Sequence, residues 1–442
     1  MDAFDLGLAG YVLNSSVTSY SYDALLDAYV GGVLPEAKDD DVLAASQAAA
    51  ARRLAEPLER ALERDGSLAA YRDIDLPLVA VLAIMERTGA AIDTAHLKSL
   101  GESTQRELDE LSARIYGIAG EEFNLDSPKQ LSHILFEVLG LKPRKKNQRG
   151  YSTDASVLKE LSAEHEVPAL VLRYRELAKI KSTYIDTLPR LRAGDGRVHT
   201  TFNETVTTTG RLSSSDPNLQ NIPVRTEFGR QIRTCFVPLE RGERFLSADY
   251  SQIELRLLAH LSADEHLVAA FNEGEDFHAE TAARVFGVPV DEVTPQLRSR
   301  AKAVNFGIVY GQQAYGLSQS LDIPMAEARE MIDRYFEAYP GVRTYLDRTV
   351  AEAKRTGYAE TMYGRRRPIP ELKMRNPAQR SFGERTAMNH PMQGTAADII
   401  KIAMARVARR MRDEGFRARM ILQVHHELDF ECPEDEVEAL TA

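Results

Sequence analysis

Two segments that lie far apart in the chain carry residues suited to phosphoryl transfer. Asp249 ends the strand-like run 244–248, and Glu427 follows the apolar run 419–424. A strand that ends in a carboxylate holds that group at the edge of a sheet with little positional freedom. Hard divalent cations such as Mg²⁺ take oxygen ligands, often one or two carboxylates plus substrate phosphates. Two such ions, roughly 3.5–4 Å apart, activate an attacking oxygen and neutralise a leaving one. A lone strand-end aspartate is usually a turn residue, so this hypothesis depends on what accompanies Asp249.

The residues that support a phosphoryl-transfer role for Asp249 lie on a helix predicted over residues 298–310. Arg298, Lys302, Phe306 and Tyr310 recur every four residues, so they form one stripe along a single helix face. Two cations followed by two aromatic rings suit one ligand, with phosphates at the cationic end and a flat base at the aromatic end. A solvated basic turn that runs into a buried aromatic stripe would explain each residue type. It does not explain why both sets share a face.

The pattern around these residues is mostly helical, with a few strands. A sheet interrupted by a large helical insertion is the simplest arrangement, because strand-like runs flank a long helical block. The predicted helices span about 42–68, 75–88, 96–118, 127–138, a segment after the 152–154 cap, 169–184, several within 255–380, and 383–413; the predicted strands span 197–202, 244–249 and 419–424.

Composition sets broad limits. A chain of 442 residues is expected to form two to four domains. The hydrophobic fraction of 43% and charged fraction of 27% are ordinary for a soluble globular protein. Only two cysteines, Cys235 and Cys432, fit a reducing cytosol. We find no apolar run long enough to span a bilayer and no signal-peptide pattern, so we expect a soluble intracellular protein.

The net charge of −11 argues, by itself, against a polyanionic partner. Nucleic acid is bound by local basic surfaces, however, so the distribution of charge matters more than its sum. Residues 142–149 and 365–367 are basic clusters, and a solvated loop is the ordinary interpretation of either one alone. Together with the motifs above, the cluster at 142–149 becomes a candidate contact with a phosphate backbone.

Five ordered stretches resemble the A family of DNA polymerases. The resemblance implies an α/β fold with right-hand polymerase architecture, in which a palm sheet is flanked by helical fingers and a helical thumb. It also implies a remnant of a 3′–5′ exonuclease-like domain at 1–70, a thumb at 71–196, palm at 197–270 and 383–442, and fingers at 271–382. The matching stretches are 209–223, 249–256, 298–311, 385–398 and 423–427.

The resemblance also implies roles for individual residues in deoxynucleotide addition to a primer 3′ end. Two Mg²⁺ ions, with Mn²⁺ as a substitute, would be held by Asp249, the carbonyl of Tyr250 and position 426. The catalytic set would be Asp249, Glu427, Arg298 and Lys302. The nucleotide would contact Glu254, which excludes a 2′-hydroxyl, together with His278, Phe306 and Tyr310. The DNA would contact Arg211, Gln252, Arg385, Asn389, Gln393, His425, Lys145 and Lys146.

This chain departs from the family pattern at three places. His426 stands where the family has its second metal-binding aspartate, and neutral imidazole is a poor ligand for Mg²⁺. Neither Glu427 nor Asp429 is expected to point where residue 426 points, because side chains alternate along a strand. We therefore expect severely weakened catalysis with substrate binding retained. The chain stops at Ala442, where the family continues the palm, and its N-terminal part matches only the end of the exonuclease domain, so we expect no proofreading.

Other functions fit the same residues less well. A non-catalytic primer-template binding protein is the main alternative, and His426 supports it. A single-subunit RNA polymerase shares the Arg-Lys helix and strand aspartates, but Glu254 and the 211–223 segment weigh against it. A kinase or another P-loop NTPase has no support, because this sequence contains no Gly-rich Lys-Ser/Thr loop. We expect primer-template DNA and deoxynucleoside triphosphates as partners, a monomer with no membrane association, and a location in the bacterial cytosol or nucleoid.

Overall fold

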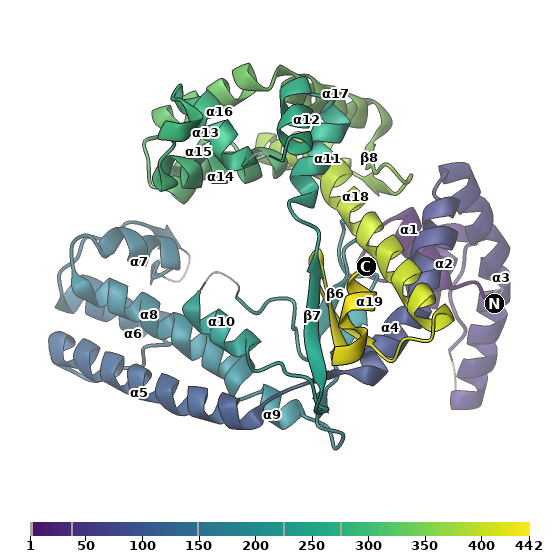
Figure 1. The fold of residues 1–442 in the computed structure, drawn as a ribbon, viewed down its shortest axis with the longest axis horizontal. Coiled ribbons are helices and arrows are strands. Elements are labelled where there is room, and N and C mark those ends of the chain that lie inside the picture. The colour runs from purple at the N-terminus through teal and green to yellow at the C-terminus, as the bar shows by residue number, and fades with distance from the viewer. Residues whose placement is uncertain (1–2, 37–38, 148–149, 224–225, 275) are drawn as a thin grey trace. The chain divides into compact units, whose positions relative to one another are not determined.

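The computed structural model describes residues 3–36, 39–147, 150–223, 226–274 and 276–442 (Figure 1). The chain folds into two compact units. Unit 1 comprises residues 1–86, 202–215 and 246–430, and unit 2 comprises residues 87–201, 216–245 and 431–442. The predicted five-part division is finer than these units and stays a prediction.

Unit 1 is helical apart from short strands. Its α-helices are α1 (Leu6–Leu13), α2 (Tyr22–Tyr29), α3 (Asp40–Asp65), α4 (Leu76–Thr88), α11 (Ile253–Ser262), α12 (Glu265–Asn272), α13 (Phe277–Phe286), α14 (Pro295–Val309), α15 (Ala314–Leu321), α16 (Met325–Ala338), α17 (Pro340–Thr356) and α18 (Pro377–Asp413). The strands that lie wholly or mainly in unit 1 are β5 (Thr201–Asn203), β6 (Ser213–Ser215), β7 (Glu243–Asp249), β8 (Tyr358–Glu360), β9 (Arg366–Pro368), β10 (Arg419–Val424) and β11 (Glu427–Pro433). A π-helical segment (Ala70–Asp75) and 3-10 turns (Val290–Glu292 and Pro370–Lys373) complete it.

Unit 2 is a helical body with short hairpin strands. Its α-helices are α5 (Thr94–Ala119), α6 (Pro128–His133), α7 (Ala155–Leu161), α8 (Glu166–Ile180), α9 (Leu188–Leu191), α10 (Glu227–Arg233) and α19 (Val437–Thr441). Its strands are β1 (Ala90–Ala91), β2 (Lys146–Asn147), β3 (Gly150–Tyr151) and β4 (Arg197–Val198). π-helical segments at Ile134–Val138 and Lys181–Ile185 and a 3-10 turn at Glu434–Glu436 complete it.

The sheet that carries the predicted metal segments has the strand order β10-β11-β7. Helices α11 to α18 lie between β7 and β10 in the sequence, which confirms the predicted helical insertion into a sheet. Within this insertion, α11 to α17 share a core in which Leu258, Phe277 and Tyr335 are buried. That core fixes the helix that bears the cationic and aromatic stripe.

Local sequence explains why α14 begins where it does. The Thr294 hydroxyl accepts a hydrogen bond from the backbone N–H of Leu297 at 3.2 Å, which satisfies one otherwise unpaired helix donor. Pro295 follows at the first helical position, where a missing N–H costs nothing. The cap therefore sets the register of the helix and the direction of its stripe.

The basic run at 365–367 is not the solvated loop that its composition predicts. Arg365 is only 3% exposed, and Arg366 and Arg367 are half-buried. The Arg365 guanidinium contacts Asp75 through two hydrogen bonds of 2.8 and 3.0 Å. It also donates to Asp398 at 2.7 Å, and Lys401 donates to Asp75 at 2.6 Å. Two buried cations and two buried carboxylates compensate each other here, which reverses the sequence-based interpretation.

This charge cluster connects distant parts of unit 1. In Figure 1, α18 runs from the helical insertion towards α1–α3. Asp398 and Lys401 belong to the second half of this helix. Asp75 ends the π-helical segment before α4. The cluster therefore fastens α18 to the start of α4.

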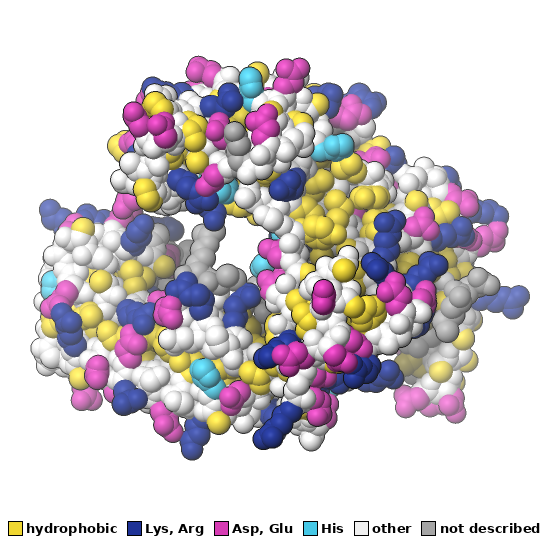
Figure 2. All heavy atoms as spheres, in the orientation of Figure 1, with side chains coloured by type: hydrophobic (Ala, Val, Ile, Leu, Met, Phe, Trp, Pro, Cys, Tyr) yellow, Lys and Arg dark blue, Asp and Glu magenta, His cyan; other side chains and the backbone are white. Residues whose placement is uncertain are grey.

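Acidic and basic side chains are interspersed over most of the face drawn in Figure 2. In the part of the chain that the structure describes, no helix combines the length and apolarity needed to cross a bilayer.

Candidate functional site

The two predicted metal segments meet at a tight hairpin. β10 ends at Val424 and β11 begins at Glu427, so His425 and His426 form the turn between them. The backbone N–H of Tyr250, directly after β7, donates to the carbonyl oxygen of His426 at 3.2 Å. The prediction that these distant segments converge is confirmed.

The turn and its neighbouring loop use unusual backbone geometry. His425 has φ +55° and Gln252, which precedes α11, has φ +54°. Residues other than glycine adopt this left-handed region uncommonly, and such strain gathers where surrounding structure imposes it. Both side chains are exposed and both residues line the same cavity.

That cavity, of about 290 Å³, brings together four separate sequence motifs. They are the two metal segments, the aromatic end of α14 and the segment that begins near Arg211. The lining residues are Arg211, Asp249, Tyr250, Gln252, Ile253, Glu254, Phe306, Tyr310, His425 and His426.

Glu254, which is 4% exposed, is the lining residue that the side chains of Tyr310, Arg211 and His426 all approach. Its Oε2 accepts a hydrogen bond from the Tyr310 hydroxyl at 2.8 Å, and its Oε1 accepts one from Arg211. His426 Nε2 lies 3.7 Å from the same Oε1. Burial opposes ionisation of this carboxyl, yet the contacts with His426, Arg211 and Tyr310 hold its pKa below the ordinary value. Glu254 is therefore an ionised carboxylate with both oxygens engaged.

The α14 stripe forms as predicted. Arg298 and Lys302 are exposed, Phe306 is half-buried, and Tyr310 caps the helix with its ring exposed. The Lys302 ammonium lies 6.0 Å from the centre of the Phe306 ring, so cation and ring share a face. Phe306 and Tyr310 line the cavity, whereas Arg298 and Lys302 lie on the same face nearer the start of α14 and do not line it. The arrangement suits a ligand with a polyanionic end.

Asp276 is a site residue that the sequence interpretation missed. Its Oδ2 accepts a hydrogen bond from Arg298 at 2.6 Å, and that bond lowers the pKa of the Asp276 carboxyl although partial burial opposes this. Its Oδ1 caps α13 through the N–H groups of His278 and Ala279. The capping pattern of an aspartate before a helix was the available signal. Asp276 orients the Arg298 guanidinium.

His278 lies deeper than its predicted nucleotide-binding role implies. It is 3% exposed, and its Nδ1 lies 3.0 Å from the Asn305 amide nitrogen. Burial, together with the positive charges of Lys302 and Arg298, lowers the pKa of His278 to about 4. A role in binding phosphate would therefore be that of a neutral imidazole.

We expect the His278 imidazole to stay neutral at pH 6 and to gain its proton only near pH 4. Because its folded pKa lies below its ordinary value of 6.5, the unfolded chain takes up this proton first. Acidification from about pH 6.5 towards 4 therefore costs stability. Imidazole ¹⁵N shifts, assigned with a His278→Gln variant, measure the titration, and protonation near pH 6.5 would contradict the burial argument.

The donor set around Asp249 does not fit a pair of divalent ions. Asp249 is an exposed carboxylate, but His426 Nε2 lies 3.3 Å from the Arg211 guanidinium, which would repel a nearby dication. His426 Nδ1 is buried and finds no hydrogen-bond partner among the residues that the structure describes. Over those same residues, no three His, Cys, Asp or Glu side chains gather as a metal site. One carboxylate plus ligand phosphates suits at most one hard cation.

The two remaining carboxylates of the hairpin do not replace the missing one. Asp429 is 4% exposed and accepts a hydrogen bond from the Ser247 hydroxyl at 2.5 Å. Glu427 is half-buried at the first position of β11. Neither residue lines the 290 Å³ cavity. The carboxylate of Asp429 is therefore engaged by Ser247, and because residue 426 lies in the turn before β11, the predicted alternation between residues 426 and 429 stays a prediction.

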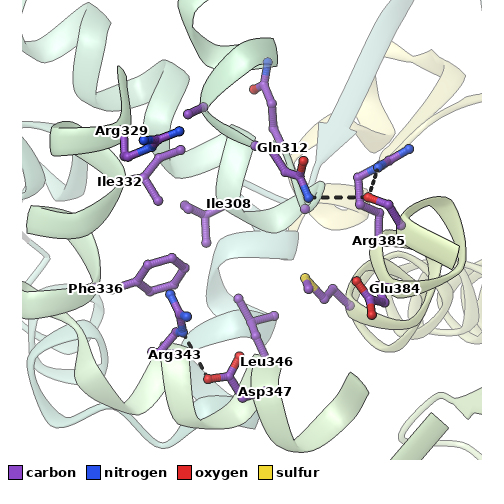
Figure 3. A pocket seen from close by; sticks show the side chains of 15 residues that line it. Ile308, Gln312, Arg329, Ile332, Phe336, Arg343, Leu346, Asp347, Glu384 and Arg385 are labelled. Atoms are coloured by element: carbon purple, nitrogen blue, oxygen red, sulfur yellow. Dashed lines mark hydrogen bonds and ion pairs between the residues drawn. The ribbon is translucent and has the colours of Figure 1, made fainter. Parts of the chain in front are cut away.

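The residues of α18 that were predicted to contact DNA do not line the 290 Å³ cavity. Arg385, Asn389 and Gln393 follow one another at four-residue spacing. Arg385 lines a second cavity of about 260 Å³, where its guanidinium donates to Ser381 at 2.9 Å (Figure 3). Figure 3 shows the apolar side of this cavity formed by Ile308, Ile332, Phe336 and Leu346. The DNA-binding role of the three residues stays a prediction.

The basic cluster at 142–149 belongs to unit 2. Lys145 and Lys146 are exposed; the Lys145 ammonium lies 3.8 Å from Asp154, and that of Lys146 lies 5.9 Å from the Tyr151 ring centre. Gln148 and Arg149 lie outside the described residues. Both lysines are accessible to a ligand, and their contact with a DNA phosphate backbone stays a prediction.

Comparison with known proteins places this geometry in a family. Residues 94–442 match the model of DNA polymerase family A. The chain is 48% identical over 453 aligned positions to DNA polymerase I of Bacillus subtilis, covering 99% of this chain and 52% of that protein. It is 50% identical over 375 positions to the thermostable DNA polymerase I of Thermus aquaticus, covering 84% of this chain and 44% of that one. The chain thus spans about half the length of the curated relatives it matches.

A solved structure agrees with the sequence relatives. The POL domain of Pol1 from M. smegmatis, in complex with DNA primer-template and dNTP, superposes with a TM-score of 0.93 at 43% identity. The match covers 99% of this chain and 76% of that one. It confirms the predicted polymerase fold class. The chain belongs to family A of the DNA polymerases.

Proposed function

We propose that this chain is built for DNA-templated addition of deoxynucleotides to a primer 3′ end. The observation that carries the proposal is one helix, α14, whose exposed cations and aromatic rings share a face that leads into the cavity beside Asp249. The solved relative with primer-template and dNTP supports the same substrates. The predicted thumb at 71–196 would place Lys145 and Lys146 on the duplex backbone.

The residues present supply binding and positioning. Arg298 and Lys302 would grip the triphosphate, and Phe306 would pack against the sugar and base. Phosphoryl transfer needs positioning and charge neutralisation more than covalent chemistry. The oxygen of the primer 3′-hydroxyl would bond to the α-phosphorus and its proton would pass to solvent. The bond between the α-phosphorus and the α–β bridging oxygen would break, and pyrophosphate would leave.

We propose that His426 severely impairs this chemistry. The family carries out transfer with two divalent metal ions, and the donor set here compensates only one. Imidazole accepts softer ions such as Mn²⁺ more readily than Mg²⁺, but the Arg211 guanidinium beside His426 opposes either ion.

A catalytically inactive primer-template binding protein is the second candidate. The contact between His426 and Arg211 favours it, because this contact occupies the position where the family has a metal-binding carboxylate. Arg298, Lys302 and the 290 Å³ cavity would still bind a nucleotide. Both candidates therefore predict formation of a ternary complex, and they differ in turnover.

Ternary-complex formation tests what both candidates share. With a dideoxy-terminated primer-template, we expect dATP to stabilise the protein–DNA complex in a mobility-shift assay. Lys302→Met should weaken the apparent dATP affinity roughly tenfold, because a charge-assisted contact with phosphate is lost. Lys373→Met, which removes another exposed lysine of unit 1, should leave the affinity unchanged. Equal dATP affinity in the native chain and in Lys302→Met would refute the assigned role of α14.

A further inference from the structure

The connection between β5 and β6 is anchored to the N-terminal helical segment of unit 1. The two strands pair with each other, and residues 204–212 join them. The hydroxyl of Tyr11, on α1, donates to the backbone carbonyl of Thr207 at 2.8 Å, and the hydroxyl of Ser15, just after α1, donates to that of Thr208 at 3.0 Å. Tyr11 is fully buried and Ser15 is 8% exposed. Water therefore has little access to either hydrogen bond.

These two anchors lie at the start of a turn that ends in Arg211. The Thr207 hydroxyl donates to the backbone carbonyl of Arg211 at 2.6 Å, which closes the turn 207–211. Within the turn, Gly210 has φ +89°, and a Cβ at this position would lie 3.0 Å from Cδ and Nε of Arg365. Glycine accommodates both the left-handed backbone and so close a neighbour. The turn is thus confined by the two hydroxyl groups and by the Arg365 side chain.

The Arg211 side chain connects this turn to the nucleotide cavity. One of its terminal nitrogens donates to Glu254, and the residue lines the 290 Å³ cavity. Its Nε is buried and finds no hydrogen-bond partner among the residues that the structure describes. Because this inner nitrogen is not anchored, the position of the guanidinium depends strongly on the backbone that carries it. A shift of the turn would therefore move the positive charge that faces Glu254.

We propose that Tyr11 and Ser15 are positioning residues for nucleotide binding, which hold the turn 207–211 and, through it, the Arg211 guanidinium at the cavity. The inference rests on the proposed function, because the ligand is the nucleotide bound there. Neither Tyr11 nor Ser15 lines the cavity, so each acts through Arg211. The N-terminal segment, which the sequence interprets as a remnant of another domain, thereby serves the polymerase site.

Removal of single hydroxyl groups tests this role. The measured quantity is the apparent dissociation constant of dATP on a dideoxy-terminated primer-template, so that no chemistry follows binding. Tyr11→Phe and Ser15→Ala should each raise it about fivefold, the value of one net hydrogen bond. Tyr71→Phe is the matched control, because Tyr71 is 1% exposed in the same core and its hydroxyl accepts from the N–H of Asp5 at 2.7 Å. The control should lose a similar amount of stability in urea unfolding and keep dATP affinity within about twofold of the native value.

A double-mutant cycle separates the positioning of Arg211 from a general loss of packing. Arg211→Ala should weaken dATP binding roughly tenfold, because the cavity loses a cation and Glu254 loses its donor. In that background, Tyr11→Phe should change the dATP affinity by less than about twofold, since the side chain that the hydroxyl positions is absent. The effect of Tyr11→Phe on urea unfolding should be the same in both backgrounds.

The possible results separate this inference from the function on which it rests. Failure of the native chain to bind dATP would overturn the proposed function and this inference with it. If the native chain binds dATP, the inference alone is overturned when neither hydroxyl variant weakens binding more than Tyr71→Phe does. It is likewise overturned when Arg211→Ala keeps the native affinity, or when the loss caused by Tyr11→Phe persists undiminished in the Arg211→Ala background.

Discussion

His426→Asp is expected to raise the rate of primer extension by roughly 10²–10³-fold in Mg²⁺. The cavity beside Asp249 offers one exposed carboxylate, while His426 is engaged with Arg211. A carboxylate at position 426 adds the missing negative charge and an oxygen ligand of the type that Mg²⁺ prefers. Single preorganised groups that stabilise developing charge are worth about 2.7–4 kcal/mol of barrier, which corresponds to the stated factor.

The measurement is single-turnover extension of a primer-template by one deoxynucleotide, in Mg²⁺ and separately in Mn²⁺. His260→Asp is the matched control, because His260 is an exposed residue of α11 outside the cavity lining. It should leave the rate unchanged. If extension by His426→Asp does not exceed that of the native chain, residue 426 is not what limits catalysis. Extension by the native chain at a rate equal to that of the variant would remove the case for an inactive binding protein.

Asp75→Asn is expected to lower the free energy of unfolding by about 3–5 kcal/mol, since it breaks a buried charge cluster by removing one partner. Asp75 is fully buried and accepts from Arg365 and Lys401. With its charge removed, Arg365 would keep only its contact with Asp398, and Lys401, whose side chain is fully buried, would lose the carboxylate to which it donates. Urea unfolding at pH 7 measures the loss. Glu56→Gln, which breaks the exposed pair with Arg60, is the control and should change stability by less than about 0.5 kcal/mol.

The same cluster predicts a pH dependence. Burial opposes ionisation of Asp75, but the charges of Arg365 and Lys401 outweigh it and hold its pKa below the ordinary value of 3.8. A depressed carboxyl pKa stabilises the folded chain above the ordinary value, and that stabilisation is lost as pH falls through the folded pKa. The stability difference between the native chain and Asp75→Asn should therefore shrink below about pH 4. A loss of less than about 1 kcal/mol at pH 7 would show that the cluster is dispensable.

The sequence determined the local parts of the candidate site. Four-residue spacing alone placed Arg298, Lys302 and Phe306 on one face of a helix, because an α-helix repeats every 3.6 residues whatever surrounds it. Alternation along a strand predicted that neither Glu427 nor Asp429 would point where residue 426 points, although residue 426 lies in the turn before β11. Strand-like runs that end at Asp249 and Val424 predicted the two segments that meet at the hairpin. Each of these inferences uses geometry within a few residues of chain.

Only the tertiary structure decided which charges are solvated and which nitrogen faces which neighbour. Arg365 has the sequence surroundings of a loop arginine, and it is buried because Asp75, 290 positions away, compensates it. His278 is neutral because it is enclosed, and Arg385 lies at a different cavity from Tyr310. The contact of His426 with Arg211 joins residues 215 positions apart. Burial and electrostatics depend on such long-range neighbours, which periodicity and composition do not encode. The sequence therefore marked residue 426 as a departure from the family pattern, while the fold decided what its side chain contacts.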